Sequence, residues 1–466
     1  MPVSLFVRAF LTLLFFLFLS CAAQRGLAFD SSYWVWHRVT PLTAEEVGEL
    51  DRQKVTRLFW EVGEISYQQG RWNWSNQPVA REVRNSSGLR VIPVIQIVPN
   101  EALASSKDDL IALLKPVAES GELQIDCDCP DRLLYHYAEF MGQLHREVPR
   151  LTFTALAHWI HHPAWEALEE NAVEVVPMFY DLYADPTKTS ETDPPFPLLK
   201  PGEPQMEAWR GCRIPWQAGF PTFVRVTLYD LNGRSRGHIR DWSWNEICFQ
   251  KALRPVGSVR FGVGLFAVDE NLRLNLTPLP QGSLLAVRCA DREVIAEAAA
   301  AVRRLGAQGV VYFRLPDGSD PSGWSLRQVG ELTRGDPSIP KLSVRLSEGQ
   351  QLELSNVSDS DLPPRIFDGS GAVDRGYALE VDADAPIFRE AEGGEFWRVA
   401  AHISPDQNPR PTSIPLATRL TFWFSHLRAG EVLRSGLVQL APGVKAEQLR
   451  FRVLGTEENL SWRKFD

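Results

Sequence analysis

The order of apolar and polar positions divides the chain into two parts. Between residue 32 and about residue 335, short apolar runs alternate with helical stretches, which is typical of repeated βα units. Several runs, such as VIPVIQIV and VEVVPMFY, are almost continuously apolar, as parallel strands covered on both faces require. Eight strands are expected, over Tyr33 to Arg38, Thr56 to Val62, Arg90 to Val98, Leu123 to Cys127, Leu151 to Ala157, Val173 to Tyr180, Phe223 to Tyr229 and Val310 to Leu315.

Helical segments separate these strands. Thr43-Ala44-Glu45-Glu46 has the spacing of a capping box and should begin a helix after the first strand. The stretch from residue 131 to 148 and the alanine-rich stretch from 291 to 305 have the same character, and the second ends near Gly306. The fold class predicted is α/β, with a (β/α)8 TIM-like barrel favoured over an open doubly wound sheet.

Two insertions interrupt the predicted barrel. The first, residues 185–217, is rich in proline and acidic residues, and the second, residues 230–284, contains Trp242 and Trp244. Both should lie beyond the carboxyl ends of strands six and seven. In a barrel of this type, that end carries the functional site.

After Gly335 the pattern changes to alternating apolar and polar residues with frequent turns, as in KLSVRLSEGQQLELSNVS. This alternation predicts a small C-terminal β-sandwich-like domain over residues 341–466. The segment from Asp336 to Pro340 has the composition of a linker. The barrel is therefore assigned to residues 24–335.

The first 23 residues have the pattern of a signal peptide. Arg8 supplies the positive region, and Ala9 to Leu19 form an apolar run that is too short to span a membrane. Cys21-Ala22-Ala23 has the small residues that a signal peptidase needs. We therefore expect a periplasmic or extracellular location. The alternative is a lipoprotein, in which lipidated Cys21 tethers the chain to a membrane.

The net charge limits the classes of partner, and the cysteine content limits the role of disulfides. The formal net charge of -9 becomes -10 when Arg8 leaves with the signal peptide, and such an acidic surface argues against nucleic acid as a partner. The six cysteines are too few to be the main source of stability. Cys212 and Cys248 could pair between two loops. Cys127 and Cys129 should share one face of a strand as a buried pair of thiols.

Two acidic residues are the strongest chemical signal. Asp126 and Asp128 alternate at the end of the fourth predicted strand, so both carboxyls should point into the barrel. Like charges at about 6 to 7 Å raise at least one pKa, which suits acid–base catalysis. Glu61, on a neighbouring strand, is the third candidate catalytic residue. The alternative is that the aspartates only cap loops or pair with Arg314.

Polar and aromatic residues at the other strand ends indicate a sugar ligand. Flat aromatic faces suit the C–H faces of pyranoses, and each such ring taken alone is more often part of a core. The predicted substrate-binding residues are Trp36, Gln96, Trp159, Tyr180, Tyr229, Asp230 and Arg314.

The histidines near the fifth strand raise the alternative of a metal site. Imidazoles of His158, His161 and His162, with two nearby aspartates, are groups that can hold zinc. Histidines in a loop that leads into a helix are, however, ordinary surface residues. We predict neither a metal nor a cofactor, since a P-loop, a nucleophile elbow and a dinucleotide-binding motif are all lacking.

Longer stretches of the sequence resemble known families. YWVWHR, LQIDCDC, ALAHWIHHPAW, GVVYFRLP and LELSNVSDSDLPP, in that order, resemble an uncharacterised family of exported bacterial proteins (domain of unknown function 3142). Asp126 and Asp128 are also similar to the last two aspartates of the chitinase-like glycosidase barrels. In those barrels a catalytic glutamate follows, and its position falls on Pro130 here.

The sequence therefore predicts an exported glycoside-hydrolase-like barrel that acts on polysaccharide. Asp126 and Asp128 would position and polarise the substrate, with Glu61 as the acid or base. The alternative is a carbohydrate-binding or envelope-scaffold protein that has lost the catalytic acid, as Pro130 suggests.

Overall fold

The computed structural model describes residues 29–76, 88–183, 186–256, 262–317, 320, 323–335, 338–348, 350–367, 375–403, 410–456 and 461–465. The predicted signal peptide and Cys21 lie outside these residues. The chain divides into two compact units, and the first comprises the chain up to Phe179 with Gly202–Phe220 and Ala299–Tyr312. The second comprises Tyr180–Pro201, Pro221–Ala298 and the chain from Phe313 onward.

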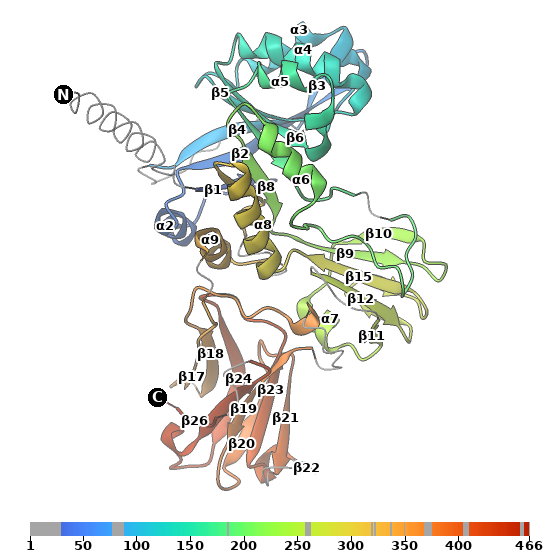
Figure 1. Cartoon of the computed structure of the whole chain (residues 1–466). Helices are drawn as coiled ribbons and strands as arrows, with labels where there is room; N and C mark the ends of the chain where they lie inside the picture. Colours follow the sequence, from blue (N-terminus) through green and yellow to red (C-terminus); the bar gives the residue numbers. More distant parts are fainter. Residues whose placement is uncertain are drawn as a thin grey trace, which may run out of the picture. The chain divides into compact units, whose positions relative to one another are not determined.

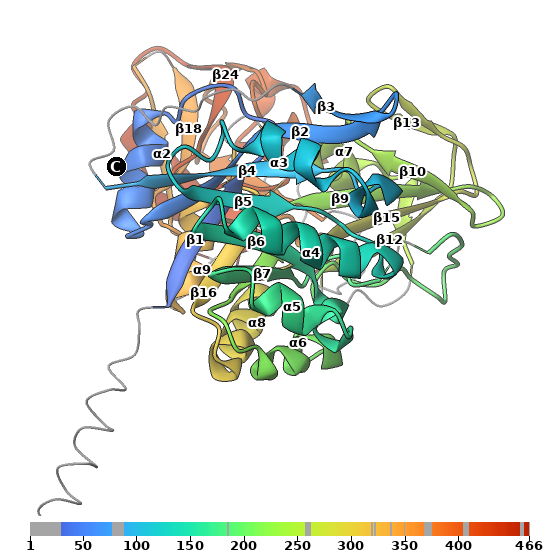
Figure 2. The same cartoon turned by 90° about the horizontal axis from the view of Figure 1, so that it is seen from above.

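The first unit is built on a closed parallel barrel (Figures 1 and 2). Its strands follow the order β1-β2-β4-β5-β6-β7-β8-β16, and β16 returns to pair with β1. Strand β3 (Arg71–Asn76) extends β2 as an antiparallel hairpin. The predicted (β/α)8 barrel is confirmed. The barrel strands are β1 (Asp30–Val35), β2 (Arg57–Gln68), β4 (Arg90–Ile97), β5 (Glu122–Asp126), β6 (Arg150–Leu156), β7 (Glu174–Met178), β8 (Gln217–Pro221) and β16 (Gly309–Phe313).

Helices follow most of these strands and cover the outside of the barrel, as Figure 2 shows for α3, α4 and α5. Thr43 forms the predicted capping box with Glu46 at the start of α2. The two other helices expected from the sequence are present as α4 and α8. The helices are α2 (Ala44–Arg52), α3 (Lys107–Leu114), α4 (Leu134–His145), α5 (Trp165–Glu169), α6 (Pro204–Ala208), α7 (Trp244–Phe249), α8 (Arg292–Leu305) and α9 (Leu326–Arg334). Short 3-10 turns are η1 (Glu101–Ala104), η2 (Asp131–Leu133), η3 (Ala157–His161), η4 (Trp209–Gly211), η5 (Arg365–Phe367), η6 (Ile414–Leu416) and η7 (Ala446–Gln448).

The seventh barrel strand differs from the prediction. The barrel uses β8, whereas the expected run from Phe223 to Tyr229 forms β9 of an antiparallel sheet. The sequence of β8 is QAGFP, which is short and contains Gly219 and Pro221 and so gives a weak strand signal. Gly219 lets the Trp34 ring pack closely against β8, because a Cβ there would lie 3.1 Å from that ring. This packing involves residues far apart in sequence, so the local pattern does not reveal it.

The second unit holds an antiparallel sheet inserted between β8 and β16. Its order is β10-β9-β15-β12-β11, and a core that includes Val226, Phe266, Leu285 and Ile247 lies between one face and α7. The strands are β9 (Val224–Tyr229), β10 (Ser235–Ile239), β11 (Leu253–Pro255), β12 (Val263–Val268) and β15 (Leu284–Cys289), with a hairpin of β13 (Leu272–Leu274) and β14 (Thr277–Leu279).

The C-terminal part of this unit is a sandwich of two antiparallel sheets around one core, as the sequence predicted. The first sheet contains β17 (Leu342–Leu346), β18 (Gln351–Asn356), β24 (Val432–Leu440) and β20 (Phe388–Ala391). The second contains β22 (Arg410–Pro411), β21 (Arg398–Ile403), β23 (Arg419–Phe424), β19 (Tyr377–Asp382), β25 (Arg450–Leu454) and β26 (Arg463–Lys464).

The cysteines differ in part from expectation. Cys127 and Cys129 are buried free thiols, as predicted. Cys212 and Cys248, proposed as a pair, are also free. Over the described residues, every helix is too short or too polar to cross a bilayer.

Candidate active site

The interior of the barrel is layered from its amino end to its carboxyl end. Near the amino end, Arg57 and Gln217 both bond to Glu174, at 2.8 Å and 2.6 Å. Above this layer, Trp34 Nε1 donates to Gln124 Oε1 at 2.6 Å. Both layers are buried. These two layers fill the amino end and the middle of the barrel, and the side chains of the next layer lie toward the carboxyl ends of the strands.

Asp126 forms part of the next layer. It follows Gln124 by two positions on β5, so strand alternation points its side chain to the same inner face. The hydroxyl of Thr154 on β6 donates to Asp126 Oδ1 at 2.7 Å. The backbone of Asp126 pairs with Gln96 on β4. The carboxyl of Asp126 is thus bonded to the neighbouring strand β6, at the carboxyl end of β5.

Asp126 and Asp128 differ in burial, and so in how strongly their pKa values are raised. Asp126 is half-buried, and burial together with the negative charge of Asp128 raises its pKa to about 7. Asp128 is exposed on one side, and loss of hydration on its protein side raises its pKa to a lesser extent. No arginine or lysine pairs with either carboxyl among the contacts of the described residues. Near neutral pH, Asp126 therefore exchanges a proton.

Glu61 lies on the inner side of β2 but is only 3% exposed. Its Oε2 accepts a hydrogen bond from the backbone N–H of His37 at 3.0 Å and lies 3.7 Å from His37 Nδ1. His37 has a φ of 53°, in the left-handed region that costs a non-glycine residue energy. This hydrogen bond holds the strained turn after β1. Glu61, the candidate acid or base of the sequence analysis, is therefore buried and bonded to the turn after β1.

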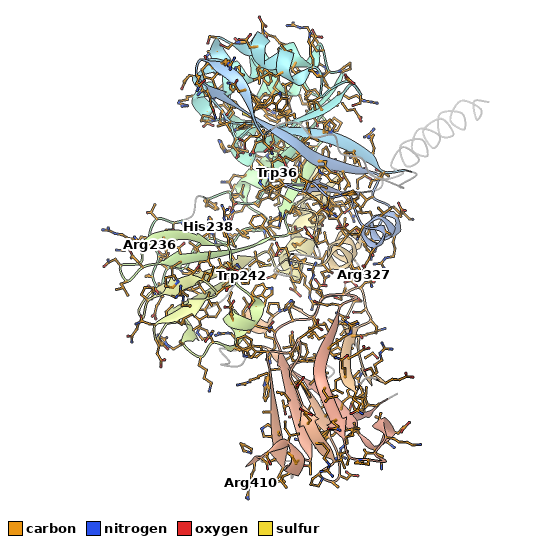
Figure 3. All side chains as sticks on the ribbon, turned by 180° about the vertical axis from the view of Figure 1, so that it is seen from behind. Trp36, Arg236, His238, Trp242, Arg327 and Arg410 are labelled. Atoms are coloured by element: carbon orange, nitrogen blue, oxygen red, sulfur yellow. The ribbon has the colours of Figure 1, made fainter. Side chains whose placement is uncertain are left out.

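Trp36 and Gln96 lie on the same side of the barrel as Asp126. Trp36 immediately follows β1 and is partly exposed, with its ring 6.2 Å from the His37 ring (Figure 3). Gln96 is partly exposed and lies beside Asp126 in the strand register. Together with Asp126, Asp128 and Thr154, these residues make up the candidate site at the carboxyl ends of the barrel strands.

Trp159 is not part of this surface. It was predicted as a sugar platform, but it has no exposed area and its ring packs 5.8 Å from the Tyr137 ring of α4. The short 3-10 turn η3 points the Trp159 side chain toward α4, between that helix and the barrel strands. The sequence could not distinguish this orientation, because a tryptophan at a strand end has the same pattern in either case.

Four predicted residues belong to the second unit. Tyr180 is partly exposed and stacks on Phe313 with ring centroids 5.7 Å apart. Arg314 forms an ion pair with Asp320 at 3.2 Å. Tyr229 and Asp230, expected at the end of a barrel strand, instead end β9 of the inserted sheet.

Tyr229 and Asp230 have structural environments. Tyr229 is fully buried in a small core with Val256 and Leu265. Asp230 accepts backbone hydrogen bonds from Asn232 and Arg234 in the β9–β10 turn, and these bonds lower its pKa. Their prediction as substrate-binding residues followed from the wrong assignment of the seventh barrel strand.

The three histidines near β6 do not form a metal site. His158 Nε2 lies 2.9 Å from Asp131 Oδ1, in an exposed pair. His162 Nδ1 accepts the backbone N–H of Ala164 at 3.1 Å. In the part of the chain that the structure describes, no group of three or more His, Cys, Asp or Glu side chains could hold a metal ion.

One site residue was missed by the sequence analysis. Thr154 is the direct partner of Asp126, and the alternation of Thr152 and Thr154 in β6 already indicated an inward-facing polar pair. The signal that was missed is the alternation of inward-facing polar residues on β6, which matches the alternation of Gln124 and Asp126 on β5. At Pro130, which precedes η2, the chain carries no carboxyl, and the following Asp131 turns to His158.

Comparisons with known proteins bear on the fold. No protein-family model and no curated protein matches this sequence, so the resemblance to the exported bacterial family stays a prediction. Similar solved structures include a chitinase from Chromobacterium violaceum, which is 14% identical, covers 66% of this chain and 99% of its own, and has a TM-score of 0.45.

Two further structures show the same likeness. A glycoside hydrolase family 18 N-acetylglucosaminidase from Paenibacillus barengoltzii is 11% identical, with 66% of this chain and 99% of that chain covered and a TM-score of 0.43. A chitinase-like agglutinin from Robinia pseudoacacia is 15% identical, with 66% and 99% covered and a TM-score of 0.41. At these values, function has to be argued from the side chains of this chain.

Proposed function

We propose that the barrel is a glycoside-hydrolase-type protein that acts on polysaccharide through Asp126 and Asp128. One observation carries this proposal. Two carboxyls lie at the open end of the barrel in different environments, and the pKa of the deeper one, Asp126, is raised to about 7. Cleavage of a glycosidic bond needs one carboxyl that gives up a proton and one that is ionised.

The roles of the two carboxyls follow from their exposure. Asp126 keeps a proton near neutral pH, and since Thr154 donates to Oδ1, that proton resides on Oδ2. It can be given to the oxygen of the leaving sugar. Asp128, the more exposed of the two, would in its ionised form stabilise the positive charge that develops on the sugar ring or activate water. Glu61 has a positioning role. Its carboxylate accepts a hydrogen bond from the backbone N–H of His37 and so fixes the turn after β1 that contains Trp36.

Carbohydrate suits the surroundings of this pair. The partly exposed Trp36 offers a ring face for the C–H groups of a pyranose, and the Gln96 amide offers hydrogen bonds to hydroxyls. Tyr180 and Arg314, which belong to the second unit, stay predictions from the sequence. The location of the protein outside the cytoplasm is also a proposal. The segment 1–23 would direct export, and the attachment of lipid to Cys21 would be detected as an added mass on the mature amino terminus.

Turnover on a panel of β-linked and α-linked glycans tests the catalytic role. Asp128→Asn should lower kcat by about 10²-fold to 10⁴-fold, because the variant removes one of the two carboxyls. Asp131→Asn is the matched control, since Asp131 is an exposed acid of the same loop that bonds to His158. Unchanged turnover in Asp128→Asn would remove this carboxyl from the mechanism.

A second function is favoured by Pro130. If the carboxyl missing at that position is indispensable, the barrel binds carbohydrate without cleaving it. Glycan binding by the unaltered protein with no product released, and weakened by Trp36→Ala, would support the binding function. Product release that depends on Asp126 and Asp128 would exclude it.

A further inference from the structure

A β-bulge in β2 decides which acidic side chain of this strand reaches the candidate site. Glu61 and Gly63 pair with successive residues of β4, so Val62 is an extra residue between them. Gly63 lets the bulge pack against β3, because a Cβ there would lie 2.8 Å from the Trp74 ring. The extra residue shifts the strand alternation by one position. Glu64, and not Gly63, therefore follows Glu61 on the inner face of the barrel.

The register of three neighbouring strands places Glu64 in one row with Asp126. Glu64 pairs with Gln96 on β4, and Gln96 pairs with Asp126 on β5. Paired residues of parallel strands lie at one level and on one face of the sheet. Glu64 and Gln96 are both partly exposed. The inner face of the barrel thus carries a row of two carboxyls with an amide between them.

The two carboxyls of this row lie well apart. Two strand spacings, together about 9 to 10 Å, separate the backbones of Glu64 and Asp126. Ser75 on β3, the strand beyond β2, donates to Glu64 Oε1 at 2.6 Å. Thr154 on β6, the strand beyond β5, donates to Asp126 Oδ1. Because each carboxyl is bonded to a strand outside the row, the arrangement favours the carboxyl separation of inverting glycosidases, about 6.5 to 9.5 Å, over that of retaining ones, about 5 to 5.5 Å.

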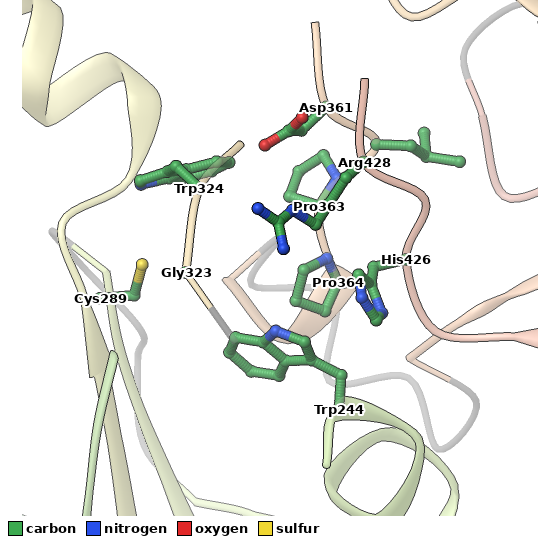
Figure 4. Close-up of a pocket in the computed structure, with 10 residues that line it drawn as sticks. Trp244, Cys289, Gly323, Trp324, Asp361, Pro363, Pro364, His426 and Arg428 are labelled. Carbon is green, nitrogen blue, oxygen red and sulfur yellow. The ribbon is translucent and has the colours of Figure 1, made fainter. Parts of the chain in front are cut away.

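A buried donor without a partner lies in the row beneath. The Gln124 side chain is fully buried, and its Nε2 has no hydrogen-bond partner among the described residues. A water molecule held between Glu64 and Asp126 would satisfy this donor, since buried waters bond to polar groups that otherwise lack a partner. By comparison, the hollow that Trp244 and Trp324 line in the second unit (Figure 4) has room for about one water molecule, so a sugar is expected at the barrel and not there.

We propose that Glu64 is the general base of the reaction and that the reaction inverts the configuration of the anomeric carbon. Asp126 gives the proton on Oδ2 to the glycosidic oxygen as the bond from that oxygen to the anomeric carbon breaks, and the bonding electron pair goes to the oxygen. A water molecule attacks the anomeric carbon from the opposite face, and the Glu64 carboxylate takes its proton. One water is consumed, and a proton returns from Glu64 to Asp126 through solvent. This role rests on the proposed function and leaves to Asp128 the stabilisation of positive charge on the sugar ring.

Turnover of the glycan panel by Glu64→Gln tests the base. The variant keeps the shape of the side chain but cannot accept a proton, so kcat should fall by about 10²-fold to 10⁴-fold with little change in KM. Glu101→Gln is the matched control, because Glu101 is an exposed acid after β4 that pairs with Arg132, and it should keep the kcat of the unaltered protein. An unchanged kcat in Glu64→Gln would overturn the role of Glu64.

Azide distinguishes a base from a residue that only supports the fold. Azide can attack the anomeric carbon without a base, while Asp126 still protonates the leaving oxygen. Sodium azide should therefore raise the turnover of Glu64→Ala at least about tenfold and give a glycosyl azide of inverted configuration. Lost turnover that azide does not restore would contradict the base.

The configuration of the first product needs no variant and stays decisive if the Glu64 variants do not fold. Nuclear magnetic resonance of a fresh reaction of the unaltered protein should show the anomer opposite to that of the substrate. The same anomer as in the substrate would overturn the role of Glu64. Unchanged turnover in Glu64→Gln together with lost turnover in Asp128→Asn would contradict only this role. No product from the unaltered protein on any glycan would overturn the proposed function as well.

Discussion

Two pairs of acidic residues with the same spacing lie in the two units. Asp126 ends β5 and Asp128 lies two residues beyond it, in a tight turn in which the N–H of Cys129 donates to the carbonyl of Cys127, whereas Glu380 and Asp382 both lie on β19 of the C-terminal sandwich. On β19, strand alternation places the two carboxyls on one face. The pairs differ in their partners, and this difference separates a group that can do chemistry from one that stabilises the fold.

The sandwich pair is neutralised by arginine. Asp382 bonds to Arg419 at 2.9 Å and to Arg450 at 2.6 Å, and Glu380 bonds to Arg452 at 2.7 Å. The indole of Trp462 lies over all three guanidinium groups, at 4.5 to 5.4 Å. Among the described residues, the side-chain partner of the barrel pair is a threonine hydroxyl on Asp126, and the protonation of Asp126 responds to pH in the neutral range.

The largest expected effect comes from breaking the sandwich network. Arg419→Met keeps the apolar stem but removes the fully buried arginine of the network, leaving Asp382 with Arg450 and Glu380 with Arg452, and should lower the free energy of unfolding by about 1.5 to 3 kcal/mol. Urea denaturation measures the change. Arg410→Met, at an exposed arginine of β22 (Figure 3), is the control and should have little effect. An equal, small change in both variants would mean that the network contributes no stability.

The next effect concerns pH. The pKa of Asp126 rises from 3.8 in a solvated chain to about 7 in the folded protein, so the folded state binds more protons between these values. The stability from this group is complete below pH 3.8 and is lost as pH rises through 7. Unfolding measured from pH 4 to 8 should therefore show a decline that Asp126→Asn lacks and that Asp131→Asn, the exposed control, retains. Parallel curves for all three proteins would contradict the raised pKa.

A smaller change should sharpen the role of Thr154. Its hydroxyl stabilises the ionised form of Asp126, which lowers the pKa against the effect of burial. Thr154→Val should therefore raise the pKa of Asp126 further, by about one unit or less, and Thr154→Ser should restore it. The carboxyl carbon shift of Asp126 in a nuclear magnetic resonance titration reports this directly. A titration midpoint that is the same in the valine and serine variants would exclude the hydrogen bond as its cause.

The parts of the fold that follow local rules could be predicted from the sequence. The capping box at Thr43 and the inward alternation of Asp126 on β5 depend on residues within a few positions of one another. Strand β8 could not, because the packing of Gly219 against the Trp34 ring involves residues far apart in sequence. The apolar sequence of β9 is equally compatible with a barrel strand and with a strand of an antiparallel sheet, so its pattern alone could not show which sheet it joins.

The candidate site was predictable to a similar extent. The position of Asp126 followed from alternation, but its single partner did not, since Thr154 is 28 positions away in sequence. The contact of Glu61 with His37 and the burial of Trp159 against Tyr137 depend on the path of the chain after each strand. The spacing of two acidic residues does not reveal whether arginine side chains will form ion pairs with them, as the arginines around the β19 pair illustrate.

The division of the chain has a consequence for the order in which the molecule is assembled during synthesis. The chain passes between the two units five times, after Phe179, Pro201, Phe220, Ala298 and Tyr312. The inserted sheet is complete at Cys289, before the ribosome has made the strand that joins β1. A nascent chain that ends before β16 holds an open sheet with two unpaired edges, so the barrel can close only after the inserted sheet has had time to form.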